Sequence, residues 1–298
     1  MKKMLFVINP NAGQKKAARS LAEMVSVFNR ANYDVNVYIT EKQGDAAEKI
    51  FQTAKEADAV VCCGGDGTFN EALTGLLYAG ADVPLGYIPA GTSNDFATSL
   101  KLPLDPVEAA KNIVQGQPVA YDVGQFNDRY FSYVASFGAF TRTSYTTPQS
   151  VKNALGHTAY ILSGIQEISQ IREISAKLEL DGKVLEGHYL FGAVCNSTSV
   201  AGILTLDPSQ VDMQDGKFEI LLVRAPSDFA EVAECIQAVQ NKTYNCKMLS
   251  FLSARNVKIT MGEAVDWTLD GEYQPGVTHV QITNRHRAIR LLTRETQA

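Results

Sequence analysis

The feature that most constrains the fold is the alternation of short apolar runs with helical patterns over the first third of the chain. The runs at residues 59–63 and 85–89 are apolar throughout, which is typical of strands covered on both faces. Strands joined through helices form right-handed crossovers, so we predict an α/β domain with a mostly parallel sheet. The predicted strands are 4–8, 34–40, 59–63 and 85–89, and the predicted helices are 18–28, 44–57 and 69–79.

Beyond about residue 120 the chain becomes rich in strand patterns and turns. Asp181-Gly182 between two β-rich runs is a strong hairpin signal. One amphipathic helix is predicted near residues 229–239, and residues 144–156, which are polar and without a period, are expected to form a loop. This arrangement predicts an antiparallel β-sandwich domain. Its predicted strands are 119–127, 129–137, 173–180, 183–195, 217–224, 256–261, 265–269 and 279–283.

Composition and charge exclude several classes of protein. The 298 residues, 45% hydrophobic and 20% charged, are typical of a globular protein with about two domains. No apolar run approaches the ~18–20 residues that cross a bilayer, and no signal-peptide pattern opens the chain, so we expect a cytoplasmic protein. The net charge of −5 is spread over both halves, which argues against nucleic-acid binding. The five cysteines form no Cys-x-x-Cys pair, so free thiols are expected rather than a zinc site or a disulfide scaffold.

Three turns rich in glycine and polar residues directly follow predicted strands, at residues 9–13, 64–71 and 89–96. Glycines let a backbone approach a phosphate closely, and the start of a helix supplies free N–H groups. Each turn taken alone is also typical of a helix cap. Because the carboxyl ends of parallel strands meet at one edge of a sheet, the three turns together favour a shared nucleotide site.

Two of these turns also contain aspartates. Asp66 lies inside the glycine loop, where a carboxylate can hold Mg²⁺ against phosphates, and Asp95 adds a second carboxylate at the next turn. The loop lacks the last glycine of the dinucleotide fingerprint, and no Walker A motif occurs in the chain. Residues 91–95 lack the second glycine of a serine hydrolase elbow, which disfavours that class.

Five motifs give the chain a resemblance to a known family. They are Asn-Pro-x-Ala-Gly at 9–13, Gly-Gly-Asp-Gly-Thr-x-Asn-Glu at 64–71, Gly-Thr-x-Asn-Asp at 91–95, Asp-Gly at 215–216 and Leu-Asp-Gly-Glu at 269–272. In this order, over nearly the whole chain, they resemble the bacterial soluble diacylglycerol kinases, relatives of the eukaryotic diacylglycerol, sphingosine and ceramide kinases. The Gly-Gly-Asp-Gly-Thr core also occurs in NAD kinases and phosphofructokinases, whereas Asn70, Glu71 and residues 91–95 favour the lipid kinases.

The resemblance implies an ATP-binding α/β domain followed by a β-sandwich, with the site in the cleft between them. It places the nucleotide-binding domain at residues 1–124 and the lipid-substrate domain at 125–283, with residues 284–298 returning to the first domain. It also implies which residues surround the nucleotide. These are Asn9, Pro10, Asn11, Ala12, Gly13, Thr40, Gly65, Asp66, Gly67, Thr68, Phe69, Asn70, Glu71 and Thr92.

The resemblance further assigns roles to acidic residues. Asp66, Asp95 and Asp122 would form a carboxylate cluster that holds catalytic Mg²⁺, partly through water. Glu272 would be the general base, because a lipid hydroxyl near pH 7 needs a carboxylate within hydrogen-bond reach. Without the resemblance, Asp122 would be an ordinary aspartate at a strand end and residues 270–272 would predict only a hairpin turn.

A second metal site is implied at residues 212–217. The family has a structural Mg²⁺ at this Asp-Gly element, and the side chains of Asp212 and Asp215 with the carbonyl of Lys217 are oxygen ligands suited to a hard cation. The same residues, without the resemblance, predict a turn between two strands.

The resulting hypothesis is an ATP- and Mg²⁺-dependent lipid kinase that phosphorylates a lipid hydroxyl, with diacylglycerol giving phosphatidic acid as the default. The alternatives are an NAD kinase, a kinase of another lipid alcohol such as phosphatidylglycerol or a sphingoid base, and a non-catalytic regulator that binds nucleotide or lipid. The enzyme would meet its lipid by transient peripheral contact with the inner face of the membrane. The family also makes a homodimer an expectation.

Overall fold

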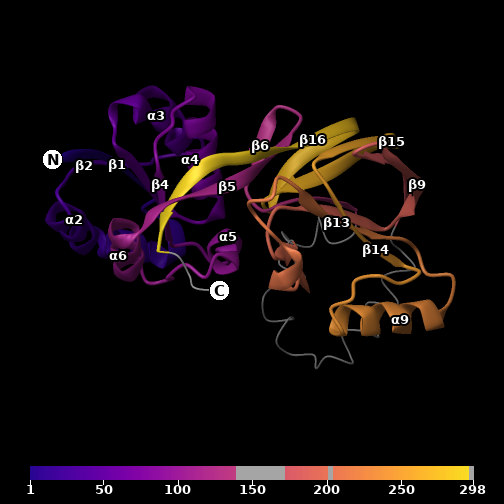
Figure 1. The fold of residues 1–298 in the computed structure, drawn as a ribbon. Helices are drawn as coiled ribbons and strands as arrows, with labels where there is room; N and C mark the ends of the chain where they lie inside the picture. Colours follow the sequence, from indigo (N-terminus) through magenta and orange to yellow (C-terminus); the bar gives the residue numbers. More distant parts are fainter. Residues whose placement is uncertain (139–171, 201–203, 295–298) are drawn as a thin grey trace.

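The computed structural model describes residues 1–138, 172–200 and 204–294, so the loop predicted at 144–156 lies outside the described residues. An α/β region, indigo to magenta in Figure 1, stands beside a β-rich region, rose to yellow. The elements of the first region are β1 (Lys2–Ile8), η1 (Ala12–Lys15), α1 (Lys16–Arg19), α2 (Leu21–Arg30), β2 (Tyr33–Ile39), α3 (Asp45–Thr53), η2 (Ala54–Glu56), β3 (Ala59–Gly64), α4 (Asp66–Ala79), β4 (Leu85–Pro89), α5 (Asp95–Ser99) and α6 (Pro106–Gln115).

The sheet of the first region is parallel and is covered on both faces. Its strand order is β2-β1-β3-β4, and every residue of β3 and β4 is buried. Helices α2 and α6 cover one face, where Phe28 meets Phe6 edge to face at 5.4 Å. Helices α3 and α4 cover the other face, through residues such as Ile50 and Leu73. Cover on both faces explains why β3 and β4 are apolar throughout.

The second region is antiparallel, so the predicted fold class is confirmed. Its core surrounds Trp267, which is fully buried and lies 5.0 Å from Phe126 and 4.8 Å from Phe137 between ring centroids. The elements are β5 (Gln117–Phe126), β6 (Arg129–Phe131), β7 (Val134–Gly138), β8 (Ile174–Leu180), β9 (Lys183–Tyr189), β10 (Phe191–Cys195), β11 (Ser199–Val200), β12 (Leu204–Thr205), η3 (Pro208–Gln210), β13 (Phe218–Val223), α9 (Phe229–Gln240), β14 (Leu249–Ala254), β15 (Asn256–Leu269) and β16 (Glu272–Thr293).

The long strand β16 joins the two regions. Near its start it pairs with β15, and from Ile282 onward it pairs with β5, with a bulge between Arg285 and Ile289. At Leu291 it lies parallel to β4 at Leu85, so the strands of both regions belong to one continuous sheet. Figure 1 shows β16 and β5 running together from the sandwich to the α/β region.

Several segment predictions differ from the structure in informative ways. The run at 129–137 is two strands, β6 and β7, because the backbone N–H groups between them turn toward the carboxylate of Asp270. The runs at 256–261 and 265–269 form one irregular strand, β15, and 279–283 is only part of β16. Sequence periodicity did not predict α5, α6 or β14.

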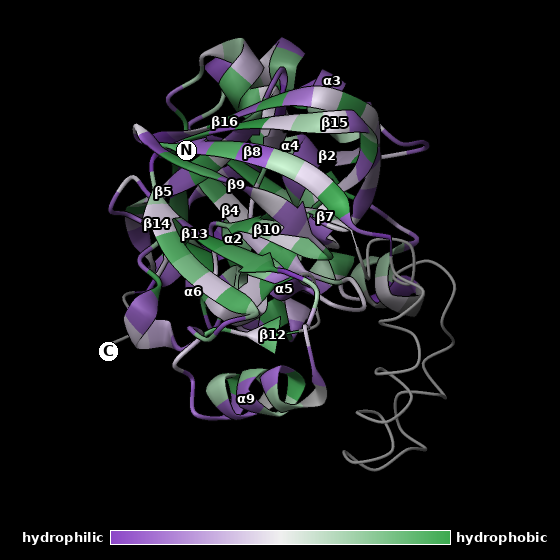
Figure 2. Cartoon of the chain, turned by 90° about the vertical axis from the view of Figure 1, so that its right-hand side faces the viewer, coloured by the Kyte–Doolittle hydropathy of each residue, from purple (hydrophilic) through white to green (hydrophobic). Residues whose placement is uncertain are grey.

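The helix predicted near 229–239 is confirmed as α9, at the bottom of Figure 2, and its residues Cys235 and Val239 pack against the core. Asp228 caps its start by accepting a hydrogen bond from the backbone N–H of Glu231 at 2.9 Å. Among the described helices, none has an apolar stretch long enough to cross a bilayer.

Candidate active site

Three turns at the carboxyl edge of the parallel sheet pack backbone against backbone. They follow β1, β3 and β4, which are neighbours in the sheet. Gly13 has a positive φ of 53°, and a Cβ there would collide with the carbonyl oxygen of Ala90. A Cβ on Gly91 would lie 2.6 Å from the Cα of Gly65. Glycine is therefore required at these contacts because any side chain would separate the turns.

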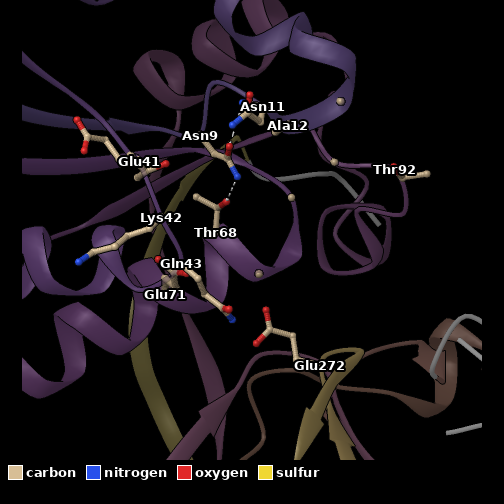
Figure 3. A pocket seen from close by; sticks show the side chains of 15 residues that line it. Asn9, Asn11, Ala12, Glu41, Lys42, Gln43, Thr68, Glu71, Thr92 and Glu272 are labelled. Atoms are coloured by element: carbon tan, nitrogen blue, oxygen red, sulfur yellow. Dashed lines mark hydrogen bonds between the residues drawn. The ribbon is translucent and has the colours of Figure 1, made fainter. Parts of the chain in front are cut away.

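The turns surround a cavity of about 490 Å³, drawn in Figure 3. Most of the residues predicted to line the nucleotide do line this cavity, together with Glu272. The lining residues are Asn9, Asn11, Ala12, Gly13, Thr40, Glu41, Lys42, Gln43, Gly65, Gly67, Thr68, Glu71, Gly91, Thr92 and Glu272.

The start of α4 forms one wall of the cavity. Its first turn contains Gly67 and Thr68, and its cap residue, Gly65, has no side chain that could cap the helix. The side-chain amide of Asn9 donates to the hydroxyl of Thr68 at 3.4 Å, which ties the first turn to the second (Figure 3). A helix start without a side-chain cap is a favourable place for a phosphate, because N–H groups and the helix dipole point toward it.

Sequence reasoning missed Glu41, Lys42 and Gln43, although it included Thr40 beside them. These residues follow β2, whose carboxyl end lies at the same edge of the parallel sheet, so the topology was the available signal. The carboxylate of Glu71 fixes this loop by accepting the backbone N–H groups of Gly44 and Ala46 at 2.8 and 3.1 Å. Lys42 is the cation among the residues that line the cavity.

Four residues expected around the nucleotide, Pro10, Asp66, Phe69 and Asn70, do not line the cavity. Phe69 is fully buried in the core. The amide of Asn70 donates to the carboxylate of Asp270 at 2.8 Å and to the carbonyl of Tyr130 at 3.0 Å, which attaches α4 to the second region.

Asp66 and Asp95 form a carboxylate pair beside the turns. The two oxygens of Asp66 accept the backbone N–H groups of Asp95 and Phe96 at 3.2 and 3.3 Å, which caps α5. Asp95 accepts a hydrogen bond from the hydroxyl of Ser199 at 2.8 Å. Burial, followed by the charge of Asp95, raises the pKa of Asp66 to about 6, and Asp270 adds to the effect. A bound cation would reduce the repulsion between these neighbouring carboxylates.

Glu272 reaches the cavity from the second region. A Cβ on Gly67 would lie 2.9 Å from its Oε1, so the carboxylate lies against the first turn of α4. Figure 3 shows it across the cavity from Asn9 and Asn11. Burial raises the pKa of Glu272, and Arg129 acts in the opposite direction. A half-buried carboxylate that faces a helix N-terminus suited to phosphate binding has the placement that a general base requires.

Glu272 is positioned by Asp270, a buried residue to which sequence reasoning assigned no role of its own. The Asp270 carboxylate accepts hydrogen bonds from the backbone N–H groups of Ser132, Tyr133 and Val134 at 2.6, 2.9 and 3.1 Å. It also accepts from the Ser132 hydroxyl at 2.8 Å and from the amide of Asn70 at 2.8 Å. Burial raises the pKa of Asp270, while the backbone donors lower it. The hairpin that carries Glu272 is therefore fixed to two neighbouring elements.

The carboxylate of Asp122 is engaged with other partners than Asp66 and Asp95. Its oxygens accept the backbone N–H groups of Gly216 and Arg287 at 2.7 Å each and contact Nδ1 of His286 at 3.0 Å. The bulge in β16 turns His286 and Arg287 toward it. The acidic neighbours that raise the pKa of Asp66 are Asp95 and Asp270, and the cluster of Asp66, Asp95 and Asp122 around Mg²⁺ stays a prediction.

The turn at 212–217 contains the second set of predicted metal ligands. Asp212 accepts the backbone N–H of Gln214 at 2.9 Å, and Asp215 accepts that of Lys217 at 2.8 Å. The Lys217 carbonyl accepts the amide of Asn284 at 3.0 Å. Close by, burial and then Asp215 raise the pKa of Glu219 to about 8. Within residues 1–138, 172–200 and 204–294, no three acidic, histidine or cysteine side chains converge as a metal-binding group.

Comparison with known proteins identifies the family. Residues 3–126 match the diacylglycerol kinase catalytic domain, and residues 134–293 match the YegS C-terminal NAD kinase beta sandwich-like domain. The diacylglycerol kinase of Bacillus subtilis (strain 168) is 30% identical over 300 residues, which cover 100% of this chain and 98% of the relative. The diacylglycerol kinase of Staphylococcus aureus (strain MRSA252) is 31% identical over 275 residues, which cover 91% of this chain and 86% of the relative.

Solved structures agree with this assignment. A crystal structure from Bacillus anthracis str. Sterne, of a protein assigned as a diacylglycerol kinase, is 26% identical and has a TM-score of 0.82. The match covers 100% of this chain and 97% of that one. The matched catalytic domain and the relatives place the chain in the class of phosphotransferases that act on an alcohol group. Within that class, the chain belongs to the diacylglycerol kinase family.

Proposed function

We propose that the protein transfers the γ-phosphate of ATP to the hydroxyl of diacylglycerol, giving phosphatidic acid and ADP. One observation carries the proposal. A Cβ added to Gly67 would lie 2.9 Å from Oε1 of Glu272, so a carboxylate of the second region lies beside the start of α4, where the helix N–H groups could bind a phosphate. Both known relatives named above are diacylglycerol kinases, which supports this acceptor.

In the proposed complex, ATP occupies the cavity with its phosphates at the start of α4. The N–H groups of the first helical turn and the hydroxyl of Thr68 donate to phosphate oxygens, and Lys42 adds a positive charge at the cavity wall. Gly65, Gly67 and Gly91 allow the phosphates to approach the backbone closely.

In the proposed reaction, the acceptor hydroxyl lies between Glu272 and the γ-phosphorus. Its oxygen forms a bond to phosphorus while the bond between phosphorus and the β,γ-bridging oxygen breaks, and ADP leaves with that oxygen. Glu272 accepts the proton of the hydroxyl, so it must be ionised before the step. Holding both reactants in line in the cavity supplies a large share of the rate.

Mg²⁺ fits the carboxylate pair at Asp66 and Asp95, because each is an oxygen donor and because burial, followed by the charge of Asp95, raises the pKa of Asp66 to about 6. We propose that these two residues hold it, with Asp122 acting as a support for the turn at 212–217. Mg²⁺, when bound, neutralises negative charge on the phosphates.

We also propose a structural cation at Asp212, Asp215 and the carbonyl of Lys217. In Asp212 and in Asp215, Oδ1 accepts a backbone N–H of the residue two positions later. Buried Glu219, with no hydrogen-bond partner for Oε2, lies near both carboxylates. A cation in this turn offsets that concentration of charge.

The acceptor is a lipid, so we propose transient contact of the protein with a membrane surface. Diacylglycerol presents its hydroxyl at the level of the headgroups, and Glu272 is 43% exposed on its side chain, which leaves it accessible to such a group.

The experiment that tests the proposal uses γ-labelled ATP and a panel of acceptors in detergent micelles, with Mg²⁺ or with excess chelator. The panel contains diacylglycerol, phosphatidylglycerol, sphingosine and a polyprenol, with NAD⁺ in a separate aqueous reaction. We expect label in phosphatidic acid with diacylglycerol and Mg²⁺ only. Label in NADP⁺, or in another lipid at higher kcat/KM, contradicts the proposed acceptor.

A further inference from the structure

Arg129 lies on a second hairpin beside Glu272. It is the first residue of β6, and the turn before it contains Asn127 with φ of 50°. Asn127 exchanges two hydrogen bonds with Gln281 of β16, donating its own N–H at 2.8 Å and accepting the Gln281 N–H at 2.9 Å. The turn that presents Arg129 is therefore attached to the strand that begins with Glu272.

The guanidinium of Arg129 is oriented by Gln274. Nη1 donates to the side-chain oxygen of Gln274 at 2.7 Å, and Nη2 lies 4.0 Å from Oε2 of Glu272. Glu272 and Gln274 are two positions apart in β16, so their side chains leave the same face of the strand. The amide nitrogen of Gln274 donates to the carbonyl of Pro275 at 3.3 Å, which fixes the amide in turn.

Among the described residues, three charged groups affect the pKa of Glu272. Glu71 on α4 and Asp270 on the β15–β16 turn are anions, and Arg129 on β6 is a cation. Burial raises the pKa of Glu272, Arg129 lowers it, and the two anions raise it further. Arg129 therefore offsets burial and two like charges at the residue that must be ionised.

We propose that Arg129 is a positioning residue that, with Gln274, keeps the Glu272 carboxylate ionised and directed toward the start of α4. This inference rests on the proposed function only for the role of Glu272 as base. Arg129 does not line the cavity, so we assign it no contact with the nucleotide.

The test combines a direct titration with kinetics on the full-length protein. Carboxyl groups of glutamate are labelled with ¹³C, the Glu272 signal is assigned from its loss in Glu272→Gln, and its pKa is measured in wild type, Arg129→Gln and Arg129→Lys. Lipid phosphorylation is measured against pH in the same variants. Arg172→Gln is the matched control, since it breaks a 2.6 Å ion pair with Glu263 in which Arg172 is 77% exposed.

We expect Arg129→Gln to raise the pKa of Glu272 by roughly half a unit and to move the acidic limb of kcat by the same amount, a loss of about 3-fold at low pH. KM for ATP should stay unchanged, Arg129→Lys should retain most of the wild-type behaviour, and the control should match wild type.

Two results overturn the inference: an unchanged pKa of Glu272 in Arg129→Gln, or a raised KM for ATP with kcat intact. A shifted pKa in a protein that phosphorylates no lipid leaves the inference standing and contradicts the proposed function instead.

Discussion

Two hairpins of the second region have the same two residues, Asp-Gly, in their turns but differ in the burial of the aspartate and in the residue that follows the turn. Asp181-Gly182 joins β8 to β9, and Asp270-Gly271 joins β15 to β16. Both residues of each turn have positive φ, 46° and 93° in the first and 50° and 81° in the second. This is the conformation that Asp-Gly favours in two-residue hairpins, so the local structure is the same.

The surroundings of the two aspartates separate the hairpins. Asp181 is exposed and accepts the backbone N–H groups of Arg255 and Asn256 at 2.7 and 2.9 Å. Asp270 is buried between β6, β7 and α4. The next residue is Lys183 in the first hairpin and Glu272 in the second. A motif therefore sets a turn, whereas burial by other elements decides whether the turn positions a reactive group.

The largest expected effect compares the residues that follow the two turns. Glu272→Gln should reduce kcat for lipid phosphorylation by about 10²–10⁴-fold, because the amide cannot accept the proton of the acceptor hydroxyl. Lys183→Gln, at the matching position on the exposed hairpin, should leave kcat unchanged. Initial rates with labelled ATP measure both. Near-normal turnover in Glu272→Gln would remove Glu272 from the mechanism.

The next effect compares the two aspartates. Asp270→Asn should lower the free energy of unfolding by about 2–3 kcal/mol, because the new NH₂ group faces donors in a buried network. Asp181→Asn should cost about 0.5 kcal/mol or less at its exposed turn. Urea denaturation with unchanged m-values measures the difference. Equal losses in the two variants would show that burial of Asp270 is not what distinguishes the hairpins.

The pH dependence of stability should differ in sign between exposed and buried carboxylates. Burial and Asp95 raise the pKa of Asp66 from 3.8 to about 6, so the unfolded state holds fewer protons than the folded state between these values. The stability of wild type relative to Asp66→Asn should therefore fall as pH rises from 4 to 6.

For Asp181 the sign is reversed. Burial acts to raise its pKa, but the backbone N–H groups of Arg255 and Asn256 lower it below 3.8 overall. Its stabilising contribution is present above that value and is lost as pH falls. Urea denaturation of wild type, Asp66→Asn and Asp181→Asn in metal-free buffer at several pH values tests both signs. The same slope for both variants contradicts the assignment.

The smallest effect compares the two glycines. Gly182→Ala and Gly271→Ala should each lower stability by about 1 kcal/mol, because both positions have positive φ. Only Gly271→Ala should also reduce kcat, since it displaces the start of β16 and thus Glu272. Thermal unfolding and initial rates measure the two effects separately. Loss of kcat in Gly182→Ala would mean that the exposed hairpin also influences the site.

Local patterns predicted the fold class and a large share of the cavity. The apolar runs of β3 and β4, with turns that contain glycine directly after them, predicted buried parallel strands and turns at one edge. Lys42 and Gln43 were missed because their side chains carry no phosphate-binding pattern, and only the order β2-β1-β3-β4 brings them to the site. Asp122 is another such case, because it lies inside β5 rather than at a strand end, and its partners depend on a bulge in a strand more than a hundred residues away.

The sequence by itself determined the alternation of strands and helices in the first region, the strand-rich second region, and which glycine turns are able to approach a phosphate, because these properties depend on near neighbours in the chain. Only the tertiary structure decided that Asn70 meets Asp270, 200 residues later, and that Glu272 faces Gly67. The physical reason is that a hydrogen bond or an ion pair depends on spatial proximity and burial. In this protein the turn between β15 and β16 brings Asp270 and Glu272 against α4.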